Sequence, residues 1–265
     1  MFDTQLSDYQ NFDYDSIIYY KPETINLSES NNIFRKIKIA VRNRDQSFGD
    51  LVFSAPKGLF SFGIQELKDH EGNTNGYIMP ISLWKKKEPT PDEIQFIKVL
   101  QNIISISQEQ VEKYVEEGVD TKRFSPLSFK KNDNVVDETK SPILYTKLIF
   151  NKKENKIGTL FIDENSNAEL DPLQILTKKC YVTGAIKIES IFLGDKVTLQ
   201  IKLYEAIVRV MKQGKRLLYN DKRGKKVSIP QAPMIPSTNS PVAVTSPQNE
   251  EEYVEEEHVE EGVEA

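Results

Sequence analysis

Apolar and polar residues alternate most regularly over residues 179–210, in two runs on either side of Gly194-Asp195. Alternation with a period of two is typical of β-strands, and a two-residue Gly-Asp loop is typical of a tight hairpin. Such a loop fixes the pairing register of the two strands. The expected pairs on the core face are Ile188–Ile201, Ile186–Leu203 and Phe192–Val197, and those on the other face are Lys187–Lys202, Glu189–Gln200 and Ala185–Tyr204.

The second face of this hairpin is unusual. Lys187 and Lys202 directly opposite each other would repel, and Tyr204 would point outward beside them. A single-stranded polyanion explains both features, because phosphates neutralise lysines and bases stack on aromatic rings. The alternative is an ordinary solvated sheet face on which a loop half covers Tyr204.

The same alternation predicts further strands. Residues 34–44 place Ile37, Ile39 and Val41 on one face, and the opposite face is mostly basic, with Lys36, Lys38 and Arg42. We also expect strands at residues 50–54, 59–64, 77–84, 143–150 and 156–162. In the run 59–64 the alternation places Phe60, Phe62 and Ile64 on one side, and we interpret that side as core rather than as a base-stacking surface. Pro80 should lie at a sheet edge or bulge.

One segment has helical periodicity. Thr90, Pro91 and Glu93 form a capping box with proline at the first helical position, which predicts a helix from Thr90 to about residue 117. Gly118 would end it. The expected buried stripe is Phe96, Ile97, Leu100, Ile103, Ile104 and Val111.

The only tryptophan, Trp84, precedes Lys85, Lys86 and Lys87. An aromatic ring beside a basic run is a candidate contact for single-stranded nucleic acid. Packing at a strand end is an equally good interpretation of the tryptophan.

Charge divides the chain. From Val227 to the end there are nine glutamates and no lysine or arginine, which leaves 31 acidic and 35 basic residues in the rest, so the body is about +4 and the tail −9. We expect an irregular N-terminal extension (1–32), one nucleic-acid-binding domain (33–227) and a disordered, proline-rich and acidic tail (228–265). Residues 212–226 carry seven basic residues and a single acid, Asp221.

The motifs of common enzymes are missing. There is no phosphate-binding glycine loop, no HExxH and no GxSxG, and the single cysteine, Cys180, has no histidine near it in sequence. We therefore expect no enzymatic activity, no cofactor and no metal site, although a metal-dependent nuclease built from distant carboxylates stays open. The lack of a signal peptide or a long apolar run predicts an intracellular protein.

Several stretches, in this order and spacing, resemble a known family: FSAPKGLFSFGIQE (53–66), GYIMPISLW (76–84) with PTPDE (89–93), SPILYTKL (141–148) and IKIESIFLGDKVTLQIKLYEA (186–206). The family is the OB-fold single-stranded-DNA-binding protein of nucleocytoplasmic large DNA viruses. The resemblance covers roughly residues 34–210. It implies a mainly β (α+β) fold, in which an antiparallel OB-fold-like barrel carries insertions that include the long helix.

The resemblance also implies a function and a location. It implies coating of single-stranded DNA in viral replication, recombination or repair, in the host cytoplasm or a viral replication factory, with packaging in the virion left open. The acidic tail is a candidate for recruiting replication proteins or for competing with DNA; a tail that serves only solubility is the alternative. Two other functions stay open: a structural or scaffold protein of a virion or replication complex, and a sliding-clamp-like processivity factor.

Overall fold

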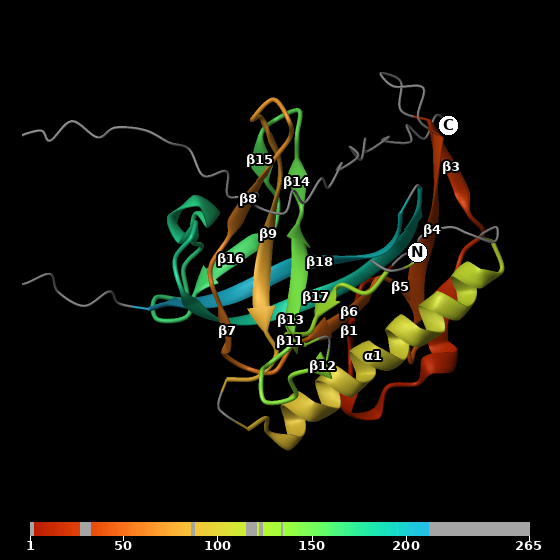
Figure 1. Ribbon diagram of the computed structural model, residues 1–265, viewed down its shortest axis with the longest axis horizontal. Coiled ribbons are helices and arrows are strands. Elements are labelled where there is room, and N and C mark those ends of the chain that lie inside the picture. Colours follow the sequence, from red (N-terminus) through yellow and green to blue (C-terminus); the bar gives the residue numbers. More distant parts are fainter. Residues whose placement is uncertain are drawn as a thin grey trace, which may run out of the picture. The chain divides into compact units, whose positions relative to one another are not determined.

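The computed structural model describes residues 3–26, 33–85, 88–114, 121, 124–133, 135–194 and 196–211. Over these residues the fold is mainly β with one α-helix, as the sequence predicts (Figure 1). The acidic tail and the basic segment 212–226 lie outside the described residues.

The centre of the fold is a circuit of paired strands. Its members are β6 (Leu51–Ser54), β7 (Leu59–Ser61), β8 (Gln65–Lys68), β9 (Thr74–Ser82), β13 (Ile143–Leu148), β17 (Cys180–Leu193) and β18 (Val197–Val210). β6 and β7 pair with β17, β7 and β8 pair with β9, β9 pairs with β13, β13 pairs with β18, and β18 pairs with β17. Every pairing in the circuit is antiparallel except β13–β18, which is parallel.

The β17–β18 hairpin contains two bulges that set which side chains meet. Leu193 pairs with Val197, so the loop has three residues rather than two, and Phe192 pairs with Thr198 instead of Val197. An extra residue in β17, Glu189, then restores the expected register, and the predicted pairs Ile188–Ile201, Lys187–Lys202 and Ile186–Leu203 are confirmed.

The other predicted pairs of the hairpin are wrong. Gln200 pairs with Ser190 instead of Glu189, because Glu189 occupies the first bulge. Ala185 pairs with Glu205 instead of Tyr204, because the extra residue of β18 at the second bulge is Tyr204.

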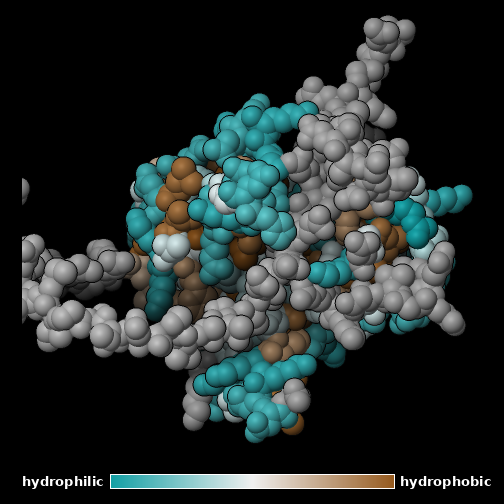
Figure 2. All heavy atoms as spheres, turned by 45° about the horizontal axis from the view of Figure 1, so that its top comes forward, coloured by the Kyte–Doolittle hydropathy of each residue, from teal (hydrophilic) through white to brown (hydrophobic). Residues whose placement is uncertain are grey.

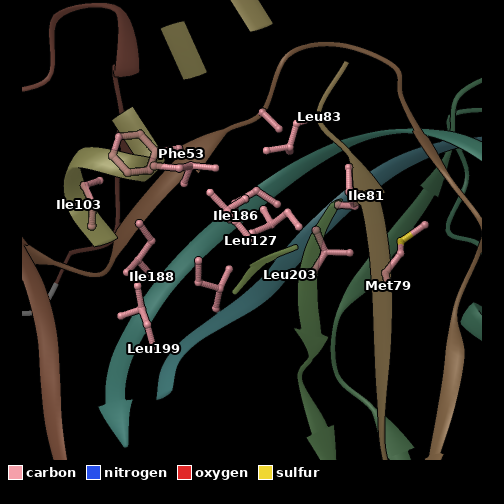
Figure 3. Close-up of a cluster of buried hydrophobic side chains, with 14 of the residues drawn as sticks. Phe53, Met79, Ile81, Leu83, Ile103, Leu127, Ile186, Ile188, Leu199 and Leu203 are labelled. Carbon is pink, nitrogen blue, oxygen red and sulfur yellow. The ribbon is translucent and has the colours of Figure 1, made fainter. Parts of the chain in front are cut away.

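The helix α1 (Pro91–Glu112) begins as predicted. The Thr90 hydroxyl accepts a hydrogen bond from the Glu93 N–H at 3.2 Å, and the Glu93 carboxylate accepts one from the Thr90 N–H at 2.8 Å. The predicted stripe is buried, apart from the half-buried Ile104, and Ile103 lies beside Phe53 of β6 (Figure 3). The helix ends at Glu112, about five residues earlier than expected.

The N-terminal segment is not irregular, which corrects the expectation. It forms β1 (Leu6–Ser7), the 3₁₀ turns η1 (Tyr9–Asn11) and η2 (Tyr14–Ser16), β2 (Ile17–Tyr19) and β3 (Glu23–Asn26). β2 and β3 pair with β4 (Ile33–Arg42), which also pairs with β5 (Phe48–Gly49). The Tyr9 ring packs edge-on against Phe96 and the Phe12 ring against Phe53, so aromatic residues hold this segment on the core.

The remaining elements are short. They are β10 (Leu127–Ser128), β11 (Lys131–Asn132), β12 (Val135–Val136), β14 (Phe150–Asn151), β15 (Lys156–Ile157), β16 (Leu160–Asp163) and η3 (Pro172–Ile175). β10 extends the sheet beside β13, and β16 pairs in parallel with β18. Three of these strands, β10, β11 and β12, lie between the end of α1 and β13.

Residues on the inner side of the circuit form the core. Met79, Ile81, Ile186, Ile188 and Leu203 point toward one another across the strands (Figure 3) and are at most 1% exposed. Pro80 lies within β9 rather than at an edge. It is tolerated there because the partner of β9 changes near this point from β7 to β8, and the Pro80 carbonyl accepts a hydrogen bond from the Ser61 hydroxyl at 2.7 Å.

Candidate nucleic-acid interface

Three of the predicted site residues meet around one carboxylate on the outer side of β17 and β18. Glu189 lies 3.0 Å from the Lys202 Nζ, 3.6 Å from the Lys187 Nζ and 3.9 Å from the Lys36 Nζ. Asp50 lies 3.0 Å from the Lys187 Nζ. These five residues are called the lysine cluster below. β4 pairs with β17 over residues 190–193, and this long-range pairing brings Lys36 to the hairpin.

Two more lysines extend the cluster along the sheet. Lys147 of β13 is the direct partner of Lys202, and Lys38 of β4 is the direct partner of Ser190. Directly opposed residues point to the same side of a sheet, so five lysines face outward here, and the carboxylates among them are Glu189, Asp50 and Glu23 of β3, the direct partner of Lys36. The formal charge of these eight residues is therefore +2.

The lysine pair is neither fully exposed nor unopposed, which corrects the expectation. The side chains of Lys187 and Lys202 are 17% and 15% exposed, and carboxylates balance both. The bulge at Glu189 is the physical reason: the extra residue brings its carboxylate within 4 Å of both lysines, so that it offsets their repulsion.

Tyr204 and Arg42 lie away from the ion pairs of the cluster. Tyr204 is 42% exposed at the second bulge, past Lys202 toward the middle of β18. Arg42 is exposed near the end of β4, and its guanidinium lies 5.8 Å from the centre of the Phe48 ring.

The Trp84 region is a separate part of the surface. The Trp84 side chain is half buried and packs against the core, and the Trp84 backbone N–H donates to the Ser141 hydroxyl at 3.0 Å. Lys85 is exposed and lines a hollow of about 520 Å³ with Tyr9, Asp92 and Glu93. Burial and a hydrogen bond to Asp92 raise the pKa of Tyr9 to about 12, so its hydroxyl stays protonated. Lys86 lies outside the described residues.

A second outer surface contains aromatic rings that the sequence analysis placed in the core. In β7 it is Leu59 and Ser61 that point inward, both fully buried, whereas Phe62 is 41% exposed and Phe60 is half buried. Gly63, with φ of 90°, breaks the alternation, so that Ile64 is buried as expected. In Figure 2, brown hydrophobic residues interrupt the teal surface on the left, the side on which Figure 1 places β7 and β16.

Within the part of the chain that the structure describes, no helix has the length and apolar character needed to cross a membrane.

Two viral proteins are similar to this chain. The chain is 27% identical over 173 residues to the "Uncharacterized protein 007R" of Invertebrate iridescent virus 3, in an alignment that covers 62% of this chain and 37% of that protein. It is 30% identical over 169 residues to the "Early 31 kDa protein" of Frog virus 3 (isolate Goorha), covering 60% of this chain and 64% of that protein. The chain thus spans less than two thirds of the length of either relative. The expected relationship to proteins of large DNA viruses is confirmed.

A family profile matches far more of the chain than the resemblance that the sequence analysis identified. The match runs from residue 10 to residue 255, so it includes the N-terminal segment and much of the acidic tail. The chain belongs to the family described as "Protein of unknown function (DUF2738)".

Proposed function

We propose that this protein binds single-stranded DNA without catalysing a reaction, and that the lysine cluster contacts the phosphates. The observation that carries the proposal is the gathering of five lysines against three carboxylates on adjacent β-strands. Sequence-independent binding to nucleic acid depends on such a surplus of positive charge, because phosphates displace counterions when they meet lysines.

The ion pairs are compatible with this role. A carboxylate among lysines holds the ammonium groups in place in the free protein, and a phosphate can take over the same ammonium groups when a strand arrives. The Glu189 carboxylate lies 3.0–3.9 Å from three lysines, so several phosphates of a bound DNA strand can take the place of this one carboxylate.

The order of the strands supports an OB-fold. When β6–β8 count as the first strand, β9, β13, β17 and β18 are the second to the fifth, and the circuit runs 1-2-3-5-4 and back to 1. An OB-fold is a five-stranded Greek-key barrel of this kind, and its second and third strands take part in binding oligonucleotides. Lys147 and Tyr145 both lie on the third strand, and Tyr145 is 41% exposed.

On this proposal the protein coats single strands during viral DNA replication, recombination or repair, in the host cytoplasm or a viral replication factory. The acidic tail would recruit replication proteins to the coated strand.

The proposal is tested by fluorescence anisotropy with labelled oligo-dT of 20 nucleotides and a duplex of equal length. We expect tight binding to the single strand, weaker binding to the duplex, and a loss of affinity as salt rises from 50 to 200 mM. Absence of binding at 50 mM salt, or an affinity that does not depend on salt, would overturn the proposal.

A further inference from the structure

A group of aromatic rings lies on the outer side of β7 and the start of β17, far along the strands from the lysine cluster. The Phe60 and Phe62 rings are 5.0 Å apart, edge to face, and the Tyr181 ring lies 6.4 Å from Phe60. The Arg209 guanidinium lies 5.0 Å from the centre of the Tyr181 ring. These four residues are called the aromatic platform below.

The platform follows from the strand pairing. Phe60 is the direct partner of Tyr181, and Tyr181 is the direct partner of Arg209, so the three side chains form one row across β7, β17 and β18. Their inward neighbours Ser61, Cys180 and Val208 are fully buried, which fixes the platform on the outside.

The exposure of these rings is energetically notable. Full burial of a phenylalanine side chain stabilises a fold by about 1.5–3 kcal/mol. Phe62 is 41% exposed, so it contributes only part of this free energy to folding. A lone exposed apolar side chain is normal, but several adjoining rings with a cation on one of them are typical of a surface that binds a partner.

Positive charge surrounds the platform and points to a polyanionic partner. Lys178 and Lys179 are exposed just before Tyr181, and Glu164 is the carboxylate that pairs with Arg209, at 3.2 Å.

We propose that the aromatic platform is a second contact for single-stranded nucleic acid, in which unpaired bases stack on Phe60, Phe62 and Tyr181 while Arg209, Lys178 and Lys179 attract the phosphates. This inference rests on the proposed function and adds to it a site made of rings. Tyr181 and Lys187 are six residues apart on β17, which is about 20 Å along a strand. One DNA strand that touches both surfaces must then reach across this distance, which an extended single strand does with only a few nucleotides.

The test uses three substitutions at Phe62, whose exposure makes each of them compatible with folding. Phe62→Ala removes the ring, Phe62→Leu keeps apolar bulk without a ring, and Phe62→Trp keeps a ring. We expect the first two to weaken binding of 20-nucleotide oligo-dT by about fivefold or more, because stacking of one base is worth roughly 1–3 kcal/mol. Phe62→Trp should bind like the unsubstituted protein.

Two further measurements separate this proposal from the proposed function. None of the substitutions changes a charge, so the slope of affinity against salt should be the same in all three variants. With oligo-dT of two nucleotides, too short to reach across about 20 Å, the lysine cluster can bind alone, so the effect of Phe62→Ala should shrink. If the unsubstituted protein binds oligo-dT and Phe62→Ala and Phe62→Leu bind it equally well, the platform proposal is wrong and the proposed function stands. If no form binds, the proposed function itself fails.

Discussion

The two ends of the β17–β18 ribbon differ in chemistry although they share the same pair of strands. At one end Lys187 and Lys202 face outward among carboxylates, and at the other Tyr181 and Arg209 face outward beside phenylalanine rings. Charge attracts a phosphate backbone over a distance and weakens with salt, whereas stacking acts only in contact and depends little on salt. On the two proposals above, the lysine cluster captures the phosphate backbone of a DNA strand, and the aromatic platform holds its bases.

Removing the lysines should have the largest effect on this comparison. The double variant Lys187→Ala/Lys202→Ala should lower the affinity for oligo-dT by about tenfold or more at 50 mM salt. The slope of log affinity against log salt should fall by about 1.4, since each phosphate contact to a single strand contributes about 0.7. Anisotropy titrations at four salt concentrations measure both quantities.

Stability should fall in the same double variant, because Asp50 would lose its lysine partner and Glu189 would keep only the more distant Lys36, on a mostly covered surface. Leaving such groups unpaired costs about 1–3 kcal/mol, which thermal unfolding would record as a lower Tm. This reverses the expectation from the hairpin pattern alone, in which relief of repulsion would leave stability equal or higher.

Two control variants make the result on the lysine pair specific. Lys130→Ala/Lys140→Ala removes the same charge from exposed lysines elsewhere and should cost little affinity or stability. Glu189→Gln removes the competing carboxylate and should raise the affinity for oligo-dT at low salt. A lysine variant that binds like the Lys130/Lys140 control would place the phosphate contacts elsewhere, with Lys36, Lys38 and Arg42 as the next residues to replace.

The sequence predicts the lysine end of the ribbon better than the ring end, for physical reasons. The pair Lys187–Lys202 is predicted by alternation and a two-residue loop. The structure has a three-residue loop, which shifts the pairing by one residue, and the bulge at Glu189 shifts it back, so the predicted pair forms. A bulge depends on side-chain contacts across several strands, and the sequence of one hairpin does not contain them. The position of Lys36 likewise needs the pairing of β4 with β17, which joins residues about 150 positions apart.

The ring end could not be predicted because alternation does not say which face is inside. In the run 59–62, Phe60 and Phe62 are larger and more apolar than Leu59 and Ser61 taken together, so the pattern favours burial of the phenylalanines. The structure buries the other pair, because Ser61 meets Cys180 on the inner side and its hydroxyl donates to the Pro80 carbonyl. Gly63 is the one signal in the sequence, since it marks a break in the strand just after Phe62.

The acidic tail offers a smaller test of the charged end. Nine glutamates beyond residue 227 are joined to a body of about +4. A glutamate run carries charge without bases, so it can compete for lysines but not for rings. Truncation after Lys226 should raise the affinity for oligo-dT a few-fold at low salt and hardly at all at 150 mM salt.

The same titration on Phe62→Ala and its truncated form separates the two ends. If the tail competes only at the lysine cluster, truncation should raise the affinity of both proteins by the same factor. Equal affinities of full-length and truncated protein at low salt would contradict competition and leave the tail as a recruitment or solubility element. A protein partner captured through the tail should be lost on truncation in either case.

The smallest expected effect concerns Cys180, which lies directly under the aromatic platform. Its thiol is fully buried opposite Ser61, and burial raises its pKa to about 11, against which a hydrogen bond with Ser61 acts only weakly. At pH 8 the thiol is therefore protonated and covered, and a thiol reagent can reach it only when β7 and β17 separate locally. Because the folded pKa lies above the ordinary value of 9.0, this group favours folding below pH 9, and that contribution is lost as pH rises toward 11.

Bases stacked across Phe60 and Tyr181 would join β7 to β17 and oppose that separation. Saturating 20-nucleotide oligo-dT should therefore slow the labelling of Cys180 about two- to fivefold, by binding the closed form in preference to the open one. The slowing should vanish in Phe62→Ala but persist in Lys38→Gln, which weakens only the charged end. Labelling rates that are the same with and without saturating oligo-dT would mean that the bound strand does not touch the platform, and the difference between the two ends of the ribbon would then have another cause.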